Sequence, residues 1–286
     1  MSAQISRRSF ILSGLAASGS LALVACGGSQ SASSSAGSTG GSTSAKTLTV
    51  AASPQPHAKI LSEFVAPELS KLGIELVVKE FTDYVQPNEV VFNGEMDANY
   101  FQHINYLDNY NKENNENLIS VGKIHYEPFG IYAGKSSDLS AIADGAEVAV
   151  PNDPTNEARA LLLLQQAGLI KLKDPDNLSA TPNDISENPH NIKFREIEAA
   201  ATPRALQDVD FAAINGNYAL EAGLHAADAL KLEEASGVAF EQYANVIATR
   251  PELEKDERIV ALVDVLSSDG FATYLKDNFG QDVLPA

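Results

Sequence analysis

An α/β fold is predicted for the chain from Lys46 onward, and three observations support it. Short β-branched runs alternate with amphipathic stretches in this region, and such alternation is typical of strands followed by packed helices. The region holds about 240 residues, which fits one large or two modest domains. Apolar residues make up 44% of the sequence, enough for an ordinary hydrophobic core.

The expected elements begin with a strand at 47–51, a helix at 57–72 and a strand at 74–81. Pro67 lies late in this helix and should kink or shorten it, because proline lacks the backbone N–H that a helix interior uses. The same periodicities predict strands at 97–101, 118–123, 147–150, 192–196, 211–214 and 245–249. They predict helices at 86–92, 104–112, 155–167, 203–207, 217–222, 257–267 and 269–278.

Residues 1–25 have the pattern of an export signal. Arg7 and Arg8 precede an uncharged stretch of apolar and small residues, 10–25, about as long as a secretory signal core. The stretch is too short and too rich in Ser and Gly for a membrane-spanning helix of about 20 apolar residues. The paired arginines resemble the twin-arginine signal. Leu12 stands where that signal usually has Lys, so the general secretory route stays open.

A lipid attachment site is predicted next. Leu23-Val24-Ala25-Cys26 resembles the bacterial lipobox, in which the Cys becomes the first mature residue and carries a diacylglycerol. Cys26 is the only cysteine, so it cannot form a disulfide within one molecule, and lipidation explains its position. Residues 26–45 then read as a flexible Ser/Gly-rich tether. We expect a lipid-anchored protein on the extracytoplasmic face of the cell membrane.

The charge and the motifs exclude several classes of function. Without the signal the chain has 18 basic and 38 acidic side chains, a net charge of −20, which argues against binding to nucleic acid. Asp174-Pro175-Asp176-Asn177 starts like a calcium loop, but Leu178 and the missing glycine exclude one. The histidines lack metal-ligand spacing, and phosphate-loop and nucleophile-elbow patterns are absent. We therefore expect a protein that is not an enzyme, without catalytic residues, metal or cofactor.

An aromatic patch is predicted near the end of the strand at 97–101. Phe101 and His103 are two residues apart and share a face if the strand reaches that far, and Tyr106 follows about one helical turn later. Tyr84 adds another aromatic side chain on a polar turn. The patch is either a strand end packed in the core or one wall of a ligand pocket.

Polar candidates lie at the ends of other elements. The helix that begins near Asp153 carries Asn156 and, one turn in, Arg159, so an anion could bind at its N-terminus and pair with the guanidinium. The alternative is a surface arginine beside a helix cap. Asn215 and Asn245 lie at strand ends, where an amide oxygen could accept from an ammonium group. Either asparagine could instead hold a turn.

Several motifs, in this order, resemble the NlpA lipoproteins, the methionine-binding receptors of bacterial ABC importers, and the likeness covers essentially the whole mature domain. The motifs are Asp83-Tyr84-Val85-Gln86-Pro87-Asn88, Asp97-Ala98-Asn99-Tyr100-Phe101-Gln102-His103, Glu127-Pro128-Phe129-Gly130-Ile131-Tyr132, Val148-Ala149-Val150-Pro151-Asn152-Asp153-Pro154-Thr155-Asn156, Gly168-Leu169-Ile170-Lys171-Leu172 and Ile214-Asn215. The resemblance implies the type II periplasmic-binding-protein fold, in which two α/β lobes hold the ligand in a cleft. With crossings near 127–129 and 243–246, lobe 1 would comprise 46–126 plus 247–286, and lobe 2 would comprise 127–246.

The resemblance also implies roles for the site residues. Four of them would wall the side-chain pocket: Tyr84, Phe101, His103 and Tyr106. Arg159 and Asn156 would hold the ligand carboxylate, and Asn215 with Asn245 would orient the polar end of the amino acid. The expected ligand is methionine, with the L form favoured, and the expected partners are an ABC permease and its ATPase, served by a monomeric receptor. The alternatives are another small amino acid, a short methionine-containing peptide, or a surface lipoprotein that acts through partner contacts.

Overall fold

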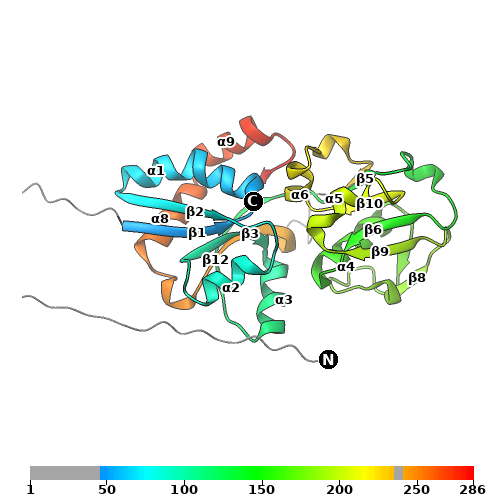
Figure 1. Ribbon diagram of the computed structural model, residues 1–286, viewed down its shortest axis with the longest axis horizontal. Helices are drawn as coiled ribbons and strands as arrows, with labels where there is room; N and C mark the ends of the chain where they lie inside the picture. Colours follow the sequence, from blue (N-terminus) through cyan, green and yellow to red (C-terminus); the bar gives the residue numbers. More distant parts are fainter. Residues whose placement is uncertain (1–45, 235–240) are drawn as a thin grey trace, which may run out of the picture. The chain divides into compact units, whose positions relative to one another are not determined.

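The computed structural model describes residues 46–234 and 241–286. The expected signal peptide, the lipidated Cys26 and the tether lie outside the described residues. Two main sheets, each covered by helices, organise the described part of the chain (Figure 1). Within those residues, no helix has both the length and the apolar content to cross a bilayer.

The first main sheet has six strands in the order β13-β4-β12-β3-β1-β2. These strands are β1 (Lys46–Ala52), β2 (Ile74–Glu80), β3 (Ala98–His103), β4 (Ile119–Tyr126), β12 (Ala244–Thr249) and β13 (Leu284–Pro285). β1 runs parallel to β2 and β3, whereas β12 runs antiparallel to β3 and β4. The late strand β12 therefore lies between two strands from the first half of the chain.

Helices cover both faces of this sheet (Figure 1). They are α1 (Ala66–Lys71), α2 (Gln86–Phe92), α3 (Ile104–Asn114), α8 (Glu257–Leu266) and α9 (Asp269–Phe279). Leu48 and Val50 of β1 pack with α1, α8 and α9, while Ala51 packs with residues of α2 and α3. The alternation of side chains along a strand thus places the two helix layers on opposite faces. Two π-type turns, η1 (Pro54–Ala58) and η2 (Leu61–Val65), precede α1, and Pro67 lies in its first turn, where a missing N–H is tolerated.

The second main sheet has five strands in the order β11-β5-β10-β6-β9. They are β5 (Gly130–Ala133), β6 (Glu147–Pro151), β9 (Lys193–Ile197), β10 (Phe211–Ile214) and β11 (Lys231–Leu232). The long helix α4 (Pro154–Gln166) packs on one face, against Val148 and Val150. Ala149, which points to the other face, packs with residues of α5 (Thr202–Ala205) and α6 (Gly216–Glu221). A small antiparallel pair, β7 (Lys171–Leu172) with β8 (Ile185–Glu187), follows α4.

The chain passes between the two main sheets at two places. β4 ends at Tyr126 in the first sheet and β5 begins at Gly130 in the second, so three residues carry the chain across. The return begins after β11 and ends where β12 starts at Ala244, opposite Tyr126. The expected boundary between Val246 and Ile247 therefore falls inside β12. We propose that lobe 1 comprises 46–126 plus 244–286, and that the described part of lobe 2 comprises 127–234.

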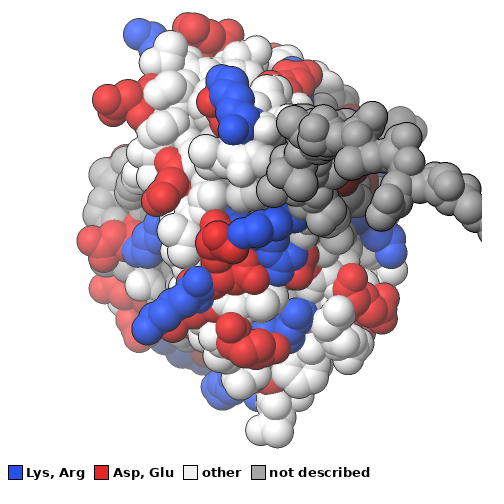
Figure 2. Space-filling model, turned by 90° about the vertical axis from the view of Figure 1, so that its left-hand side faces the viewer, with Lys and Arg blue, Asp and Glu red and all other residues white. Residues whose placement is uncertain are grey.

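Basic and acidic side chains are interleaved on the face of lobe 1 shown in Figure 2. Among the surface ion pairs of lobe 1 are Lys46 with Glu257 and Lys71 with Glu68. Such exposed pairs contribute little to stability, at most about 1 kcal/mol each. The excess acidic side chains of the sequence therefore do not form one continuous negative patch on this face.

Candidate functional site

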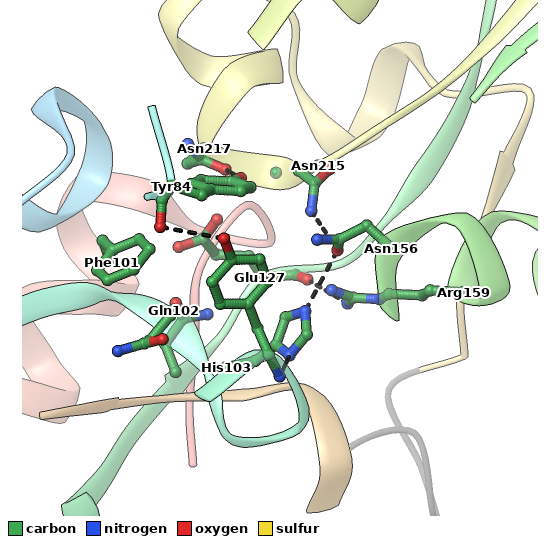
Figure 3. Close-up of a pocket in the computed structure, with 12 residues that line it drawn as sticks. Tyr84, Phe101, Gln102, His103, Glu127, Asn156, Arg159, Asn215 and Asn217 are labelled. Atoms are coloured by element: carbon green, nitrogen blue, oxygen red, sulfur yellow. Dashed lines mark hydrogen bonds between the residues drawn. The ribbon is translucent and has the colours of Figure 1, made fainter. Parts of the chain in front are cut away.

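A cavity of about 330 Å³ brings the expected site residues together (Figure 3). All eight line it, together with Gln102, Glu127, Gly216 and Asn217: Tyr84, Phe101, His103, Tyr106, Asn156, Arg159, Asn215 and Asn245. The lining residues come from both lobes, so the cavity lies between them.

Three aromatic rings form one wall of the cavity. Phe101 comes from the end of β3, Tyr106 from the first turn of α3 and Tyr84 from the turn before α2. The ring centroids of Tyr84 lie 5.8 Å from Phe101 and 5.7 Å from Tyr106, within the usual range for packed aromatic pairs. The Tyr106 hydroxyl donates to the Tyr84 carbonyl oxygen at 3.1 Å. The wall is therefore a fixed apolar surface for a small side chain.

His103 connects the two lobes as a neutral side chain. Its Nδ1 accepts from the Tyr106 backbone N–H at 3.0 Å and caps α3, so Nε2 carries the proton and donates to Asn156 Oδ1 at 3.2 Å. Burial, together with the nearby Arg159 charge, lowers the pKa of His103 to about 3. The ring therefore acts as a neutral hydrogen-bonding bridge between β3 and α4.

The Asn156 side chain bonds to residues of both lobes. Its Nδ2 donates to both carboxylate oxygens of Asp153, the N-cap of α4, at 2.9 and 3.0 Å. Its Oδ1 accepts from His103 and, at 2.7 Å, from Asn215 Nδ2. The two oxygens of one carboxylate lie too close together to occupy both amide N–H groups, so Asn156 can still donate to a ligand carboxylate. The same side chain fixes His103 and Asn215.

Arg159 already has an internal counter-ion. Its Nε donates to both oxygens of Glu233, at 3.1 and 3.0 Å, and its Nη2 donates to Glu233 Oε2 at 2.6 Å. The same Nη2 also donates to the Glu127 carbonyl oxygen at 3.0 Å, and the guanidinium carbon lies 4.2 Å from the ring centroid of Tyr243. Both charged side chains are almost completely buried, so their charges balance inside the protein.

Glu127, in the first crossing, is bound by two histidines. Its Oε1 lies 2.7 Å from His125 Nε2 and 3.3 Å from His57 Nε2. The other ring nitrogens contact hydroxyls, His57 Nδ1 that of Ser53 at 2.8 Å and His125 Nδ1 that of Tyr100. Burial lowers the pKa of His57 to about 4 and that of His125 to about 3, so both rings are neutral at pH 7.

The types of these three side chains would suit a metal ion, but their spacing indicates hydrogen bonds. Two ligands of a tetrahedral ion at about 2.0–2.2 Å would lie farther apart than the 2.7 Å that separates His125 Nε2 from Glu127 Oε1. The distance is typical of a charge-assisted hydrogen bond. His125 therefore holds the Glu127 carboxylate in place, while His57, which bonds to Asn245, lies beside it.

Two buried amide atoms on the cavity wall have no hydrogen-bond partner among the described residues. They are Asn215 Oδ1, an acceptor, and Asn217 Nδ2, a donor. Their side chains are otherwise fixed, since Asn215 Nδ2 donates to Asn156 and Asn217 Oδ1 accepts from the Tyr84 hydroxyl at 2.5 Å. A buried polar atom without a partner costs about 1–3 kcal/mol. The two atoms therefore favour a ligand that supplies both a donor and an acceptor.

Asn245 is oriented from the side of lobe 1. Its Oδ1 lies 3.0 Å from His57 Nε2, whose ring nitrogen donates because Nδ1 faces the Ser53 hydroxyl. This bond takes one of the two lone pairs of the amide oxygen, so the other lone pair and the NH₂ group can both bind a ligand. The acceptor role expected for Asn245 stays a prediction.

Sequence reasoning missed the roles of Glu127, Asn217 and Glu233. Glu127 stood inside a motif of the family resemblance, so its position was available but its cavity-facing carboxylate was not. Glu233 lies 74 residues beyond Arg159, in the stretch Lys231-Leu232-Glu233-Glu234, which contains no motif that links it to the site. Asn217 follows Asn215 by two residues, and this spacing at a strand end was the one local signal that could have identified it.

Two α/β lobes joined by two crossings, with a small polar and aromatic cavity between them, define a solute-binding protein with the type II periplasmic-binding-protein fold. The profile of the NlpA lipoprotein family matches residues 48–286, and the chain belongs to this family.

Relatives with solved structures share the fold. A lipoprotein from Ruminococcus gnavus is 51% identical, with a TM-score of 0.83, and the alignment covers 85% of this chain and 100% of that one. A nutrient-binding protein from Burkholderia cenocepacia, solved bound to methionine, is 39% identical with a TM-score of 0.78, covering 84% and 99%. The D-methionine-binding lipoprotein MetQ of Escherichia coli is 39% identical over 254 residues, covering 88% of each chain.

Proposed function

We propose that this chain is the extracytoplasmic receptor of an ABC importer, that it binds methionine with the L form favoured, and that it is not an enzyme. The single observation that carries the proposal is the cavity, whose aromatic wall adjoins a ring of fixed polar groups. An α-amino acid with an apolar side chain matches both parts. The names of the relatives support methionine as that amino acid.

The aromatic wall suits a thioether. Sulfur contacts to aromatic rings contribute about 0.3–1.5 kcal/mol each, and Tyr84, Phe101 and Tyr106 place three rings around one space. The rings form one apolar wall of the cavity, which favours a compact apolar side chain.

The polar groups suit a zwitterion. Arg159 uses Nε and Nη2 on Glu233 and Glu127, and its Nη1 carries two further N–H donors that can bind a carboxylate. Asn217 Nδ2 and the NH₂ group of Asn245 are further donors for that carboxylate. Asn215 Oδ1 is an acceptor for the ammonium group. Asn156 orients these groups and can donate one amide N–H to the carboxylate.

Ligand contacts from both lobes explain how binding is signalled. Because the cavity is complete only when the lobes are closed, a ligand stabilises the closed form, which a permease can recognise. We propose an ABC permease with its ATPase as the partner and acyl chains on Cys26 as the membrane anchor. The membrane lipoprotein TpN32 of Treponema pallidum, 40% identical over 243 residues, supports the anchoring.

The proposal is tested by identifying what the purified protein contains and binds. Mass spectrometry of small molecules released on denaturation should detect methionine, unchanged by incubation with the protein. Calorimetric titration of the refolded protein with L-methionine should show saturable binding at micromolar concentration or below. If another amino acid or a peptide such as Gly-Met gives heat and methionine gives none, the protein is still a solute receptor, but methionine is not its ligand. No binding of any solute would favour a lipoprotein that acts through partner contacts.

A further inference from the structure

Strand β3 is irregular at the point where it reaches the cavity. Val246 of β12 pairs with Gln102, and the next residue, Ile247, pairs with Tyr100, so Phe101 is an extra residue on β3. The pairing of β3 with β1 also ends at Tyr100. Two residues of β3 thus oppose one of β12, which is a β-bulge, and bulges beside functional sites often re-aim a side chain. The direction of the Phe101 ring therefore depends on this bulge.

The bulge gathers three amide side chains into one cluster, here called the amide triad: Asn88, Asn99 and Gln102. Residues three apart on a regular strand point to opposite faces, but the extra residue brings Asn99 and Gln102 together. Gln102 Nε2 donates to Asn99 Oδ1 at 2.9 Å and to Asn88 Oδ1 at 2.7 Å. Asn99 Nδ2 donates to Asn88 Oδ1 at 2.8 Å, and Asn88 Nδ2 donates to Gln102 Oε1 at 2.9 Å.

Burial makes the amide triad rigid. At most 3% of the surface of any of its three residues is exposed, so water cannot replace a bond that breaks. If one amide turned away, its partners would be left buried and unpaired, which is unfavourable. The triad therefore holds the bulge in one conformation.

The amide triad also joins the two segments of lobe 1 that carry Tyr84 and Phe101. Asn88 belongs to α2, and Asn99 Nδ2 donates a further bond to the Pro87 carbonyl oxygen at 3.2 Å. Tyr84 lies on the turn that leads into α2, and Phe101 lies on β3. The spacing of the two rings, 5.8 Å between centroids, therefore depends on the distance at which the triad holds α2 from β3.

Phe101 depends on this support more than the other rings of the aromatic wall. The Tyr84 hydroxyl donates to Asn217, and the Tyr106 hydroxyl donates to a backbone carbonyl oxygen, so hydrogen bonds orient both rings. A phenylalanine ring has no hydrogen-bonding group. Its position is set by its backbone and its packing alone, and such support decides how precisely a binding residue is placed.

We propose that the amide triad sets the side-chain selectivity of the receptor, with Asn88 as a positioning residue that does not touch the ligand. Gln102 lines the cavity, whereas Asn88 lies behind the wall (Figure 3). The inference rests on the proposed function, since it requires an amino acid whose side chain lies against the aromatic wall. Without Asn88 the bulge relaxes and the wall loosens, while the polar groups of lobe 2 keep their own hydrogen bonds. A long apolar side chain then loses contact, and a short one does not.

The test measures the ratio of two affinities. L-Methionine and L-alanine are titrated by calorimetry into the wild-type chain and into Asn88→Ala, with folding checked by circular dichroism. Methionine binding should weaken by about 5-fold or more, because contacts that open by about 0.5–1 Å lose a quarter to a half of their attraction. Alanine binding should weaken by less than about 2-fold, because its methyl group makes few contacts with the wall. The preference for methionine over alanine should therefore fall.

Asn111→Ala is the matched control. Asn111 lies in α3 of lobe 1, and its side chain donates to the Leu118 carbonyl oxygen at 2.8 Å and accepts from the Leu118 N–H at 3.0 Å. The substitution therefore also removes amide hydrogen bonds from a helix of lobe 1, but Asn111 does not line the cavity. It should lower the stability measured by urea denaturation and keep the affinity ratio of the wild type.

The possible failures are distinguishable. A wild-type ratio in folded Asn88→Ala, whether both affinities are kept or both fall equally, overturns this inference and leaves the proposed function intact. An equal fall of the ratio in Asn111→Ala would assign the effect to general loosening of lobe 1, which also overturns it. If the wild type does not bind methionine, the proposed function fails and this inference fails with it. Should Asn88→Ala not fold, Asn88→Ser, whose hydroxyl can still bond to Gln102, must lower the ratio in the same direction.

Discussion

The ring of Tyr106 packs against both other members of the aromatic wall, Tyr84 and Phe101. Tyr106→Ala should therefore weaken methionine by about 10-fold or more, through lost apolar area and sulfur contact. The side chain of alanine as a ligand is too short to reach the wall, so the affinity for alanine should fall by less than about 3-fold. Calorimetric titration with the two amino acids measures the difference.

Tyr110 provides the control for that substitution. It lies one turn farther along α3 in the same aromatic cluster, but it does not line the cavity. Tyr110→Ala should leave the ratio of the two affinities as in the wild type. Equal losses for methionine and alanine in Tyr106→Ala would contradict the role of the wall in recognition.

Residue types and motif positions predicted which side chains would line the cavity. They did not predict which hydrogen bonds each polar atom would make. Arg159 reached the cavity as expected, yet its partner Glu233 depends on a fold contact that no local pattern encodes. Asn156 and Asn245 also reached the cavity, and their bonds to Asp153 and His57 decide which amide atoms remain for a ligand. Such choices depend on three-dimensional neighbours, which a sequence read alone does not supply.

Among the elements, helix α4 contains a carboxyl group, that of Glu157, whose negative charge destabilises the folded state. Burial of Glu157, with help from Glu196 and Asp153, raises its pKa to about 7, and its Oε1 has no hydrogen-bond partner among the described residues. A carboxyl with a raised pKa in the folded state adds stability below its unfolded value of about 4.5, and that stability is lost as the pH rises through about 7.

Glu157→Gln should therefore stabilise the protein at high pH only. We expect a gain of about 1–2 kcal/mol in the free energy of unfolding at pH 8, less than the full pKa shift because the first turn of a helix favours a negative charge. Below pH 4.5 the two proteins should be equally stable. Urea denaturation at pH 8 and pH 4 measures both values, and a variant less stable than wild type at pH 8 would show that the charge is needed.

Element existence was predicted well where local periodicity is strong. The expected helix at 86–92 coincides with α2, and the strand at 211–214 coincides with β10. The four-residue strand β5 was missed because it exists through pairing with β10 and β11, which lie about 80 to 100 residues away. The start of β12 was placed after Ala244 for the same reason, since Ala244 pairs with β4 and not with β3.

For the whole molecule, closure of the lobes depends on contacts outside the cavity wall as well as on the ligand. The Tyr218 hydroxyl of α6 donates to the Thr82 carbonyl oxygen of lobe 1 at 3.1 Å, and Tyr218 does not line the cavity. Tyr218→Phe should shift the lobes toward the open form and weaken methionine and alanine alike by about 2- to 10-fold, the value of one neutral hydrogen bond. Calorimetry gives the affinities, and small-angle X-ray scattering reports the opening.

Tyr274→Phe is the matched control for closure. The Tyr274 hydroxyl donates to Glu63 Oε2 at 2.9 Å, and both residues belong to lobe 1. Its loss should leave both affinities unchanged. A change that depends on the ligand in Tyr218→Phe would indicate that Tyr218 acts on the bound side chain and not on closure.

The hydroxyls of the aromatic wall are already engaged, that of Tyr84 with Asn217 and that of Tyr106 with the Tyr84 backbone. The rings can pack against a thioether, but they have no spare donor for the oxygen of a sulfoxide, whose burial without a partner is unfavourable. We expect a receptor built in this way to bind methionine more tightly than methionine sulfoxide. A cell that depends on it would then import the reduced amino acid in preference to the oxidised one.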